Sequence, residues 1–213
     1  MSKNNAVDPT SEITAFSALT SHFSSKKIKT KKFLEAATDA VSLIEKFGKV
    51  FSPVTNDMLN NIKKLNQKYE EDIEGNKYLE EMIIKEHGQG EGTATDALLW
   101  LRRALHFLSI FYGSVIEDTL NVCPTNDLAH FLKKAYSATL EQYHGWLGTQ
   151  LFNVLSRFAP TRRQFLYTLA LNKDNQEEIV IKDMQKYNQR LYATVERIID
   201  FYNSNGLESA AIL

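Results

Sequence analysis

The residues from Ala97 to Ile116 form the most apolar stretch of the chain, and they constrain the fold more than any other segment. On length alone this stretch could cross a bilayer as a helix. It contains Arg102, Arg103 and His106, however, and each of these side chains is costly at membrane depth. The sequence therefore predicts a long central helix that is buried inside the protein and does not span a membrane.

Helical periodicity dominates the rest of the chain, and no segment has a convincing strand pattern. The 4 prolines and 9 glycines fall mostly between the periodic segments. No repeat or linker is visible, so one all-α domain is expected over residues 1–213, with residues 1–10 flexible. The other expected helices are 11–23, 33–47, 57–73, 77–87, one that carries His144 between the Pro124–Asp127 turn and Pro160, 161–171 and 177–201. Thr93 or Thr95 is the expected cap of the central helix.

The overall composition excludes several classes of protein. The net charge is −1 with 24% charged and 43% hydrophobic residues, so neither a nucleic-acid partner nor a disordered chain is indicated. Cys123 is the single cysteine and cannot form a disulfide within the chain. The first residues do not lead into the apolar core of a signal peptide. A reducing, cytoplasmic location is expected.

Local motifs give no support to enzymatic chemistry. The glycine run from Gly88 to Gly92 follows a predicted helix and lacks the Gly-Lys-Ser/Thr ending of a phosphate loop, so it is interpreted as a connection. The five histidines show no metal-binding spacing, and no serine lies in a nucleophile-elbow pattern. We therefore expect no catalytic residue, no metal and no cofactor, although residues distant in the sequence can converge.

Two neighbouring residues, His144 and Trp146, have unexpected surroundings on the predicted helix. Helical counting places Leu140, Leu147 and Leu151 beside His144, which predicts an imidazole that faces the core. The same counting places polar residues around Trp146, which predicts an exposed indole. A hydrogen-bonded core histidine is the common explanation of the first pattern, and a single exposed tryptophan is usually without significance.

A second group of polar residues lies on the helix predicted to begin at Asp57. Asp57, Asn61 and Lys64 share one face at spacings of i, i+4 and i+7. A carboxylate, an amide and an ammonium group can together hold several hydroxyl groups, and Trp100 on the central helix could stack on the ring of a sugar. Spacing alone favours a solvated face for the first three residues, and core packing is the usual role of such a tryptophan.

Three separated motifs, taken in order, change this interpretation. They are Val50–Val54 followed by Asp57, Asn61 and Lys64; Ala97–Leu105; and Tyr143–Trp146. On these motifs the chain resembles the glycolipid transfer protein family, and the similarity runs from about residue 33 to residue 169. The resemblance implies an all-α, two-layer sandwich of about eight helices with a lipid bound between the layers.

The resemblance also implies a function and a set of site residues. The expected protein is a soluble carrier that binds a glycosphingolipid and transfers it between membranes without acting as an enzyme. Trp100 would stack on the first sugar, Asp57, Asn61 and Lys64 would hold its hydroxyls, and Asp57 and His144 would bind the ceramide amide. The residues expected to line the hydrophobic pocket are Phe33, Phe47, Phe107, Leu151 and Phe152.

Relatives that carry ceramide phosphate are expected to have a cation in place of Asn61 and an arginine in place of Trp100, so ceramide-phosphate transfer is the less favoured alternative. Arg102, Arg103 and Lys64 keep this alternative open. A non-transferring glycolipid sensor or adaptor is a further alternative.

The carrier is expected to be a monomer that contacts membranes transiently. Trp146 and Tyr143 would dock at the membrane interface, where amphipathic rings prefer to lie. The charged residues that could assist at the membrane are Arg157, Arg162, Arg163 and the lysine cluster Lys26, Lys27, Lys29, Lys31 and Lys32, although such charges usually form solvated surface. The sequence leaves open whether Ile212 and Leu213 contact a lipid chain.

Overall fold

The computed structural model describes residues 13–19, 23 and 27–209, so the predictions for residues 1–10, Ile212 and Leu213 lie outside it. Over these residues the structure is all-α, with eight α-helices, as predicted. Their bounds are α1 Thr30–Glu45, α2 Ser52–Glu71, α3 Leu79–Gly88, α4 Thr93–Asp118, α5 Ala129–Thr139, α6 Trp146–Leu155, α7 Arg162–Leu169 and α8 Glu177–Ser204. Three short 3-10 helices, η1 Lys49–Phe51, η2 Glu141–Tyr143 and η3 Ser156–Phe158, lie between them.

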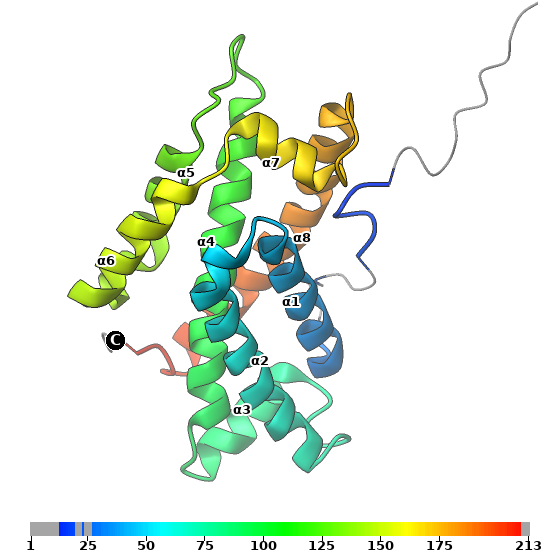
Figure 1. Cartoon of the computed structure of the whole chain (residues 1–213). Helices are drawn as coiled ribbons and strands as arrows, with labels where there is room; N and C mark the ends of the chain where they lie inside the picture. The colour runs from blue at the N-terminus through cyan, green and yellow to red at the C-terminus, as the bar shows by residue number, and fades with distance from the viewer. Residues whose placement is uncertain (1–12, 20–22, 24–26, 210–213) are drawn as a thin grey trace, which may run out of the picture.

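The helix α4 is the centre of the fold. It packs against α2, α3, α5 and α8, while α1 packs on α2 and α7 on α8. Figure 1 shows α2 in front of α4, and α1 in front of α8. The apolar side chains of α4, such as Leu98, Leu101 and Leu105, are 0% exposed. The prediction of a buried central helix is confirmed, and no helix in the described part of the chain is long and apolar enough to cross a membrane.

The N-terminus of α4 is held by a buried carboxylate from α3. Glu86 is 1% exposed and accepts hydrogen bonds from the backbone N–H groups of Ala94 and Thr95 at 2.8 and 2.7 Å. It also accepts a hydrogen bond from the Thr95 hydroxyl at 2.7 Å. The N-cap residue is Gly92, so the prediction of a threonine cap is wrong: Thr95 is inside the first turn, where its own N–H needs an acceptor.

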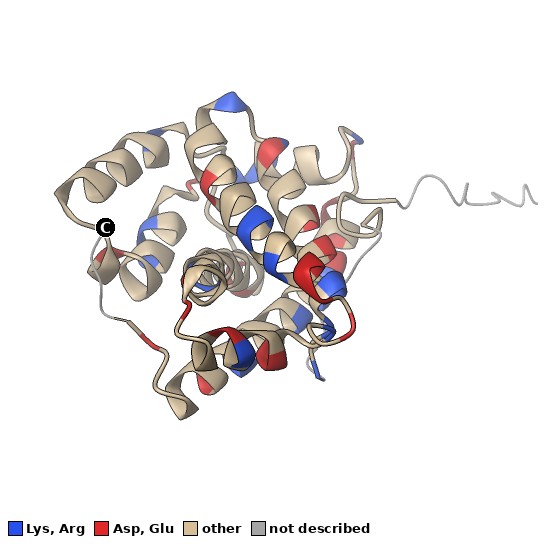
Figure 2. Ribbon diagram, turned by 90° about the horizontal axis from the view of Figure 1, so that it is seen from below, with Lys and Arg blue, Asp and Glu red and all other residues tan. Residues whose placement is uncertain are grey.

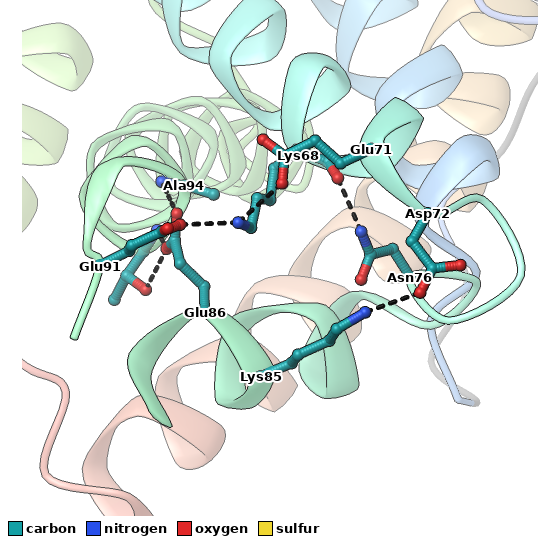
Figure 3. Close-up of polar contacts among 9 residues, drawn as sticks. Lys68, Glu71, Asp72, Asn76, Lys85, Glu86, Glu91 and Ala94 are labelled. Carbon is teal, nitrogen blue, oxygen red and sulfur yellow. Dashed lines mark hydrogen bonds and ion pairs between the residues drawn. The ribbon is translucent and has the colours of Figure 1, made fainter. Parts of the chain in front are cut away.

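An ion-pair network supports the same end of the molecule (Figure 3). Lys68 of α2 contacts Glu91 at 2.7 Å and Glu71 at 2.8 Å. Asn76, in the α2–α3 connection, donates to the Lys68 carbonyl at 2.7 Å. These contacts tie α2 to the turn before α4, and the two helices therefore hold a fixed relative position.

We expect Glu86→Ala to lower the free energy of unfolding by about 2–4 kcal/mol, because it leaves the first N–H groups of a buried helix without an acceptor. The measurement is urea unfolding followed by circular dichroism. Glu81→Ala on the same helix is the matched control, because Glu81 is exposed and forms a surface ion pair with exposed Lys27 at 2.5 Å. A loss as small as that of the control would contradict the role of Glu86.

Several predicted helix boundaries are wrong. Within the predicted helix 11–23, residues 15–18 form a turn, and the α2 helix begins at Ser52 instead of Asp57. Pro53 therefore lies in the first turn of α2, where its missing N–H costs nothing. The predicted helix through His144 is in fact two helices, α5 and α6, which are separated by residues 140–145.

Candidate functional site

Two polar residues of α2 form one side of the site. The Asn61 amide donates to an oxygen of the Asp57 carboxylate at 3.4 Å, one helical turn away. Asn61 is 6% exposed, whereas Lys64, on the next turn, is exposed. Asp57 is an exposed residue, but partial desolvation of its carboxyl group raises its pKa, although Lys64 and His144 act in the opposite direction. The negative charge of Asp57 is therefore only partly stabilised by its neighbours, and the carboxylate lies next to the buried amide of Asn61.

Aromatic rings from α4 and from the α5–α6 connection form the other side. The rings of Trp100 and His144 are stacked, with centroids 6.3 Å apart and an interplanar angle of 20°. The Tyr143 ring meets Trp100 edge-on at 6.4 Å. Trp100 is half-buried, so part of the indole stays accessible, in contrast to the fully buried residues before it on α4.

The imidazole of His144 reaches the site by a route that the sequence did not predict. His144 has an extended backbone (φ −97°, ψ 125°) just before α6, so helical counting does not apply to it. Leu147 and Leu151, predicted to face the core beside it, are 75% and 43% exposed. A Cβ atom on Gly148 would lie 3.0–3.3 Å from His144, so the glycine leaves room for the ring.

The protonation state of His144 suits hydrogen bonding to a neutral group. Its Nδ1 lies 3.1 Å from the Tyr136 hydroxyl. Burial lowers the pKa of His144 below its usual value, Asp57 raises it and Arg103 lowers it. The net direction is downward, so the ring is neutral at pH 7, with one donor and one acceptor nitrogen. If Tyr136 donates to Nδ1, the Nε2–H group remains available to a carbonyl oxygen.

Arg103 was not predicted as a site residue, yet it lies against both rings. Its guanidinium carbon is 3.4 Å from the centroid of Tyr143 and 4.7 Å from that of Trp100. The sequence indicated part of this arrangement, because Arg103 follows Trp100 by three positions on α4 and therefore lies on the same face of the helix. Tyr136, whose hydroxyl lies beside His144, was also missed, since its segment comes close to α4 only in the folded chain.

The expected pocket residues divide into two groups. Phe107 and Phe152 are half-buried and meet edge-on at 6.3 Å, between α4 and α6. Phe152 also stacks on Tyr136 at 3.8 Å, which connects the apolar region to the polar site. Phe33 lies instead in the main core, edge-on to Phe23 at 6.2 Å, and Phe47 stacks on Phe165 at 5.2 Å.

This arrangement can bind an amphiphile through a polar head and an apolar tail. Asp57, Asn61 and His144 offer donors and acceptors, Trp100 offers a flat ring, and Phe107 with Phe152 begins an apolar surface. In the described part of the chain, no three His, Cys, Asp or Glu side chains form a group that could hold a metal ion.

The fold and the site define an all-helical class of lipid-binding proteins, and comparison with known proteins assigns the family. The family model of the glycolipid transfer protein matches residues 28–171. The chain belongs to the glycolipid transfer protein family, whose members are lipid transfer proteins. The all-α, two-layer fold predicted from the resemblance is confirmed.

Two relatives illustrate the range of the family. Over 196 residues the chain is 34% identical to mouse (Mus musculus) pleckstrin homology domain-containing family A member 8, covering 87% of this chain and 37% of that protein. The chain thus spans little more than a third of this longer relative. It is 29% identical over 183 residues to the glycolipid transfer protein of Danio rerio, covering 83% of this chain and 88% of that protein.

Solved structures agree with the fold. The structure that describes how FAPP2 selects simple glycosphingolipids with this fold is 29% identical, has a TM-score of 0.83, and matches 94% of this chain and 100% of its own. Human ceramide-1-phosphate transfer protein bound to 12:0 ceramide-1-phosphate has a TM-score of 0.76 at 16% identity, and matches 93% and 96% of the two chains. The second likeness concerns the fold alone.

Proposed function

We propose that this protein is a soluble carrier that binds a glycosphingolipid and transfers it between membranes. The observation that carries the proposal is the meeting of Trp100, His144 and the Asp57–Asn61 pair in one site. In this proposal Trp100 stacks on the first sugar, while Asp57, Asn61 and Lys64 bind its hydroxyls. Asp57 and His144 bind the N–H and C=O groups of the ceramide amide.

Electrostatics supports the assignment of the amide. A buried amide carbonyl without a partner costs a few kcal/mol, and a neutral imidazole donor removes this cost. The lowered pKa of His144 keeps the ring neutral at pH 7, so that binding a neutral ceramide does not require the burial of an extra positive charge.

Transfer, in contrast to catalysis, needs only a dry surface for the lipid chain. Removing a chain from a bilayer exposes apolar surface at about 0.8 kcal/mol per CH₂ group, so spontaneous transfer is slow. We assign the beginning of this surface to Phe107 and Phe152, which are half-buried. Phe33, Phe47 and Leu151 stay predicted lining residues, although Phe33 is 3% exposed in the core and Leu151 is 43% exposed.

The proposal is tested by vesicle-to-vesicle transfer of glucosylceramide or galactosylceramide, with ceramide phosphate as the competing cargo. A carrier of the proposed kind accelerates transfer of the sugar lipids well above that of ceramide phosphate. The reverse preference would support the ceramide-phosphate alternative. Saturable binding of the sugar lipids without transfer would support a sensor or adaptor, and no uptake of any sugar lipid would refute the proposal.

We further propose that α6 docks on the membrane surface. Trp146, Leu147 and Val154 of this helix are 76%, 75% and 48% exposed, and only Leu155 is buried. The α6 helix carries no charged residue. Exposed Phe158 in η3 extends the apolar surface. An apolar helix face with an amphipathic ring at one end suits the interface between lipid headgroups and acyl chains.

The charged residues that were expected to assist docking do not form one group. Arg157 and Arg163 are exposed, but Arg162 is 9% exposed and contacts Asp118 at 3.3 Å. The expectation that Arg162 contacts the membrane is therefore wrong. Tyr143 is half-buried against Trp100 and Arg103, so its contribution to docking would be at the edge of the bound headgroup.

We expect Trp146→Ala to weaken partitioning to vesicles by about tenfold or more, because burial of an indole in the interface contributes a few kcal/mol. Sedimentation with vesicles measures this partitioning. Tyr192→Ala on α8 is the matched control, since Tyr192 is another aromatic residue that is 49% exposed. Equal partitioning and equal transfer rates for the two variants would refute docking through α6.

A further inference from the structure

Two adjacent arginines of α4 lie beside the proposed headgroup site. Arg102 and Arg103 are 5% and 2% exposed. Arg103 stacks on Tyr143 and Trp100, and Arg102 lies 5.8 Å from the ring centroid of Tyr202 on α8. Two guanidinium groups at one position form a typical binding site for phosphate, sulfate or carboxylate groups, because each offers several N–H donors in a fixed plane.

In this protein the anion is supplied by the chain itself. Both carboxylate oxygens of Glu208 accept from Nη2 of Arg102 at 2.9 Å, and one of them accepts from Nη2 of Arg103 at 3.0 Å. Arg103 also donates to the backbone carbonyl of Ser209. Glu208 belongs to the segment after α8, which runs beside the lower part of α4 and below α6 in the view of Figure 1, and beside the central helix in Figure 2.

The contacts of Arg103 leave part of its donor capacity unused. Its Nε and Nη1 groups are buried and have no hydrogen-bond acceptor within the described residues. The Glu208 side chain, in contrast, is 28% exposed, so its position can be reached from solvent. The arginine pair could therefore accept an external anion if the carboxylate of Glu208 were absent.

We propose that Glu208 is a specificity-determining residue, which occupies the anion position of Arg102 and Arg103 and thereby makes the headgroup site select neutral over anionic lipids. With Glu208 in place, an anionic headgroup beside Trp100 must either displace this carboxylate or lie close to it. Both cost free energy, since like charges repel strongly where water is largely excluded. A neutral sugar leaves the ion pairs intact. This inference deepens the proposed function and rests on it for the identity of the lipid.

The test compares Glu208→Gln and Glu208→Ala with the full-length wild-type protein. The amide variant removes the charge but still fills the position, whereas the alanine variant empties it. Glu178→Gln is the control for net charge, because Glu178 is an exposed residue at the start of α8. Circular dichroism confirms that each variant is folded. The ratio of ceramide-phosphate to glucosylceramide transfer is expected to rise by about tenfold or more in Glu208→Ala, less in Glu208→Gln, and not in the control.

A second measurement is independent of lipid transfer. In a Trp146→Phe background Trp100 is the only remaining tryptophan, so its fluorescence reports on the arginine pair beside it. Inorganic phosphate is expected to change this fluorescence saturably in Glu208→Ala and not in the parent. If inorganic phosphate at the same concentrations also changed the fluorescence of the parent saturably, Glu208 would not block anion binding to Arg102 and Arg103, and the inference would be overturned.

The two measurements distinguish the inference from the proposed function. If the folded Glu208 variants bind no phosphate and keep the wild-type lipid preference, the inference is wrong while glycolipid transfer stands. If phosphate binds as expected but no variant and no wild-type protein transfers a sugar lipid, the proposed function is wrong while the anion position of Glu208 stands.

Discussion

Trp100→Ala is expected to lower the rate of glycolipid transfer by about thirtyfold or more, while the helix content stays unchanged. The indole is half-buried and stacks on His144, so the substitution removes the proposed sugar platform together with the ring that holds the imidazole in place. The measurement is vesicle-to-vesicle transfer of galactosylceramide by the purified variant, with circular dichroism of the same sample.

Trp100→Phe is the matched control for this prediction. A phenyl ring keeps a flat surface and the contact with Arg103, so this variant is expected to retain a substantial part of the transfer rate. Retention of full transfer by the alanine variant would contradict the assignment of Trp100 as the platform. Loss of helix content in either variant would show that Trp100 acts through folding.

Asp57→Asn is expected to abolish transfer without lowering stability. The carboxylate is proposed to bind both a sugar hydroxyl and the ceramide amide, and a neutral amide accepts these hydrogen bonds more weakly. Partial burial raises the pKa of Asp57 in the folded protein. The folded state therefore disfavours the ionised form of Asp57. At every pH above the folded-state pKa, this lowers the free energy of unfolding relative to a protein in which the pKa is not raised.

The pH dependence gives this prediction a clear sign. At pH 7 the free energy of unfolding of Asp57→Asn is expected to equal or exceed that of the wild type. The difference should vanish as the pH falls below about 4, the ordinary pKa of aspartate, where the wild-type carboxyl is protonated in both states. Urea unfolding at several pH values measures it. A variant that is less stable at pH 7 would indicate a structural role for Asp57.

The sequence predicted the helical class from local information: apolar residues at helical spacing identify a helix, and the charges in the stretch around Arg102 exclude a membrane span. The candidate site residues of α2 and α4 came instead from the resemblance to the family, since spacing alone favoured a solvated face for Asp57, Asn61 and Lys64. Because α4 is one uninterrupted helix, helical counting along it placed Trp100 and Phe107 correctly on the same side.

The same counting failed where the chain leaves the helix. His144 was expected on a continuous helix with Leu147 and Leu151 beside it in the core, but its backbone is extended and both leucines are exposed. No proline marks this break, and Gly145 and Gly148 are weak signals when taken alone. Packing of His144 against Trp100 and Tyr136 fixes the imidazole instead.

The sequence by itself thus determined the all-α class, the approximate positions of most helices and the apolar face of α4, since helical periodicity is a local property of the chain. Only the tertiary structure decided that Glu86 caps α4 and that Glu208 pairs with Arg102 and Arg103. The physical reason is range. A hydrogen bond or an ion pair acts over a few ångströms, and groups on different helices or segments come within that distance only when packing places them there. This holds for Glu86 and Ala94, 8 positions apart, as well as for Glu208 and Arg102, 106 positions apart.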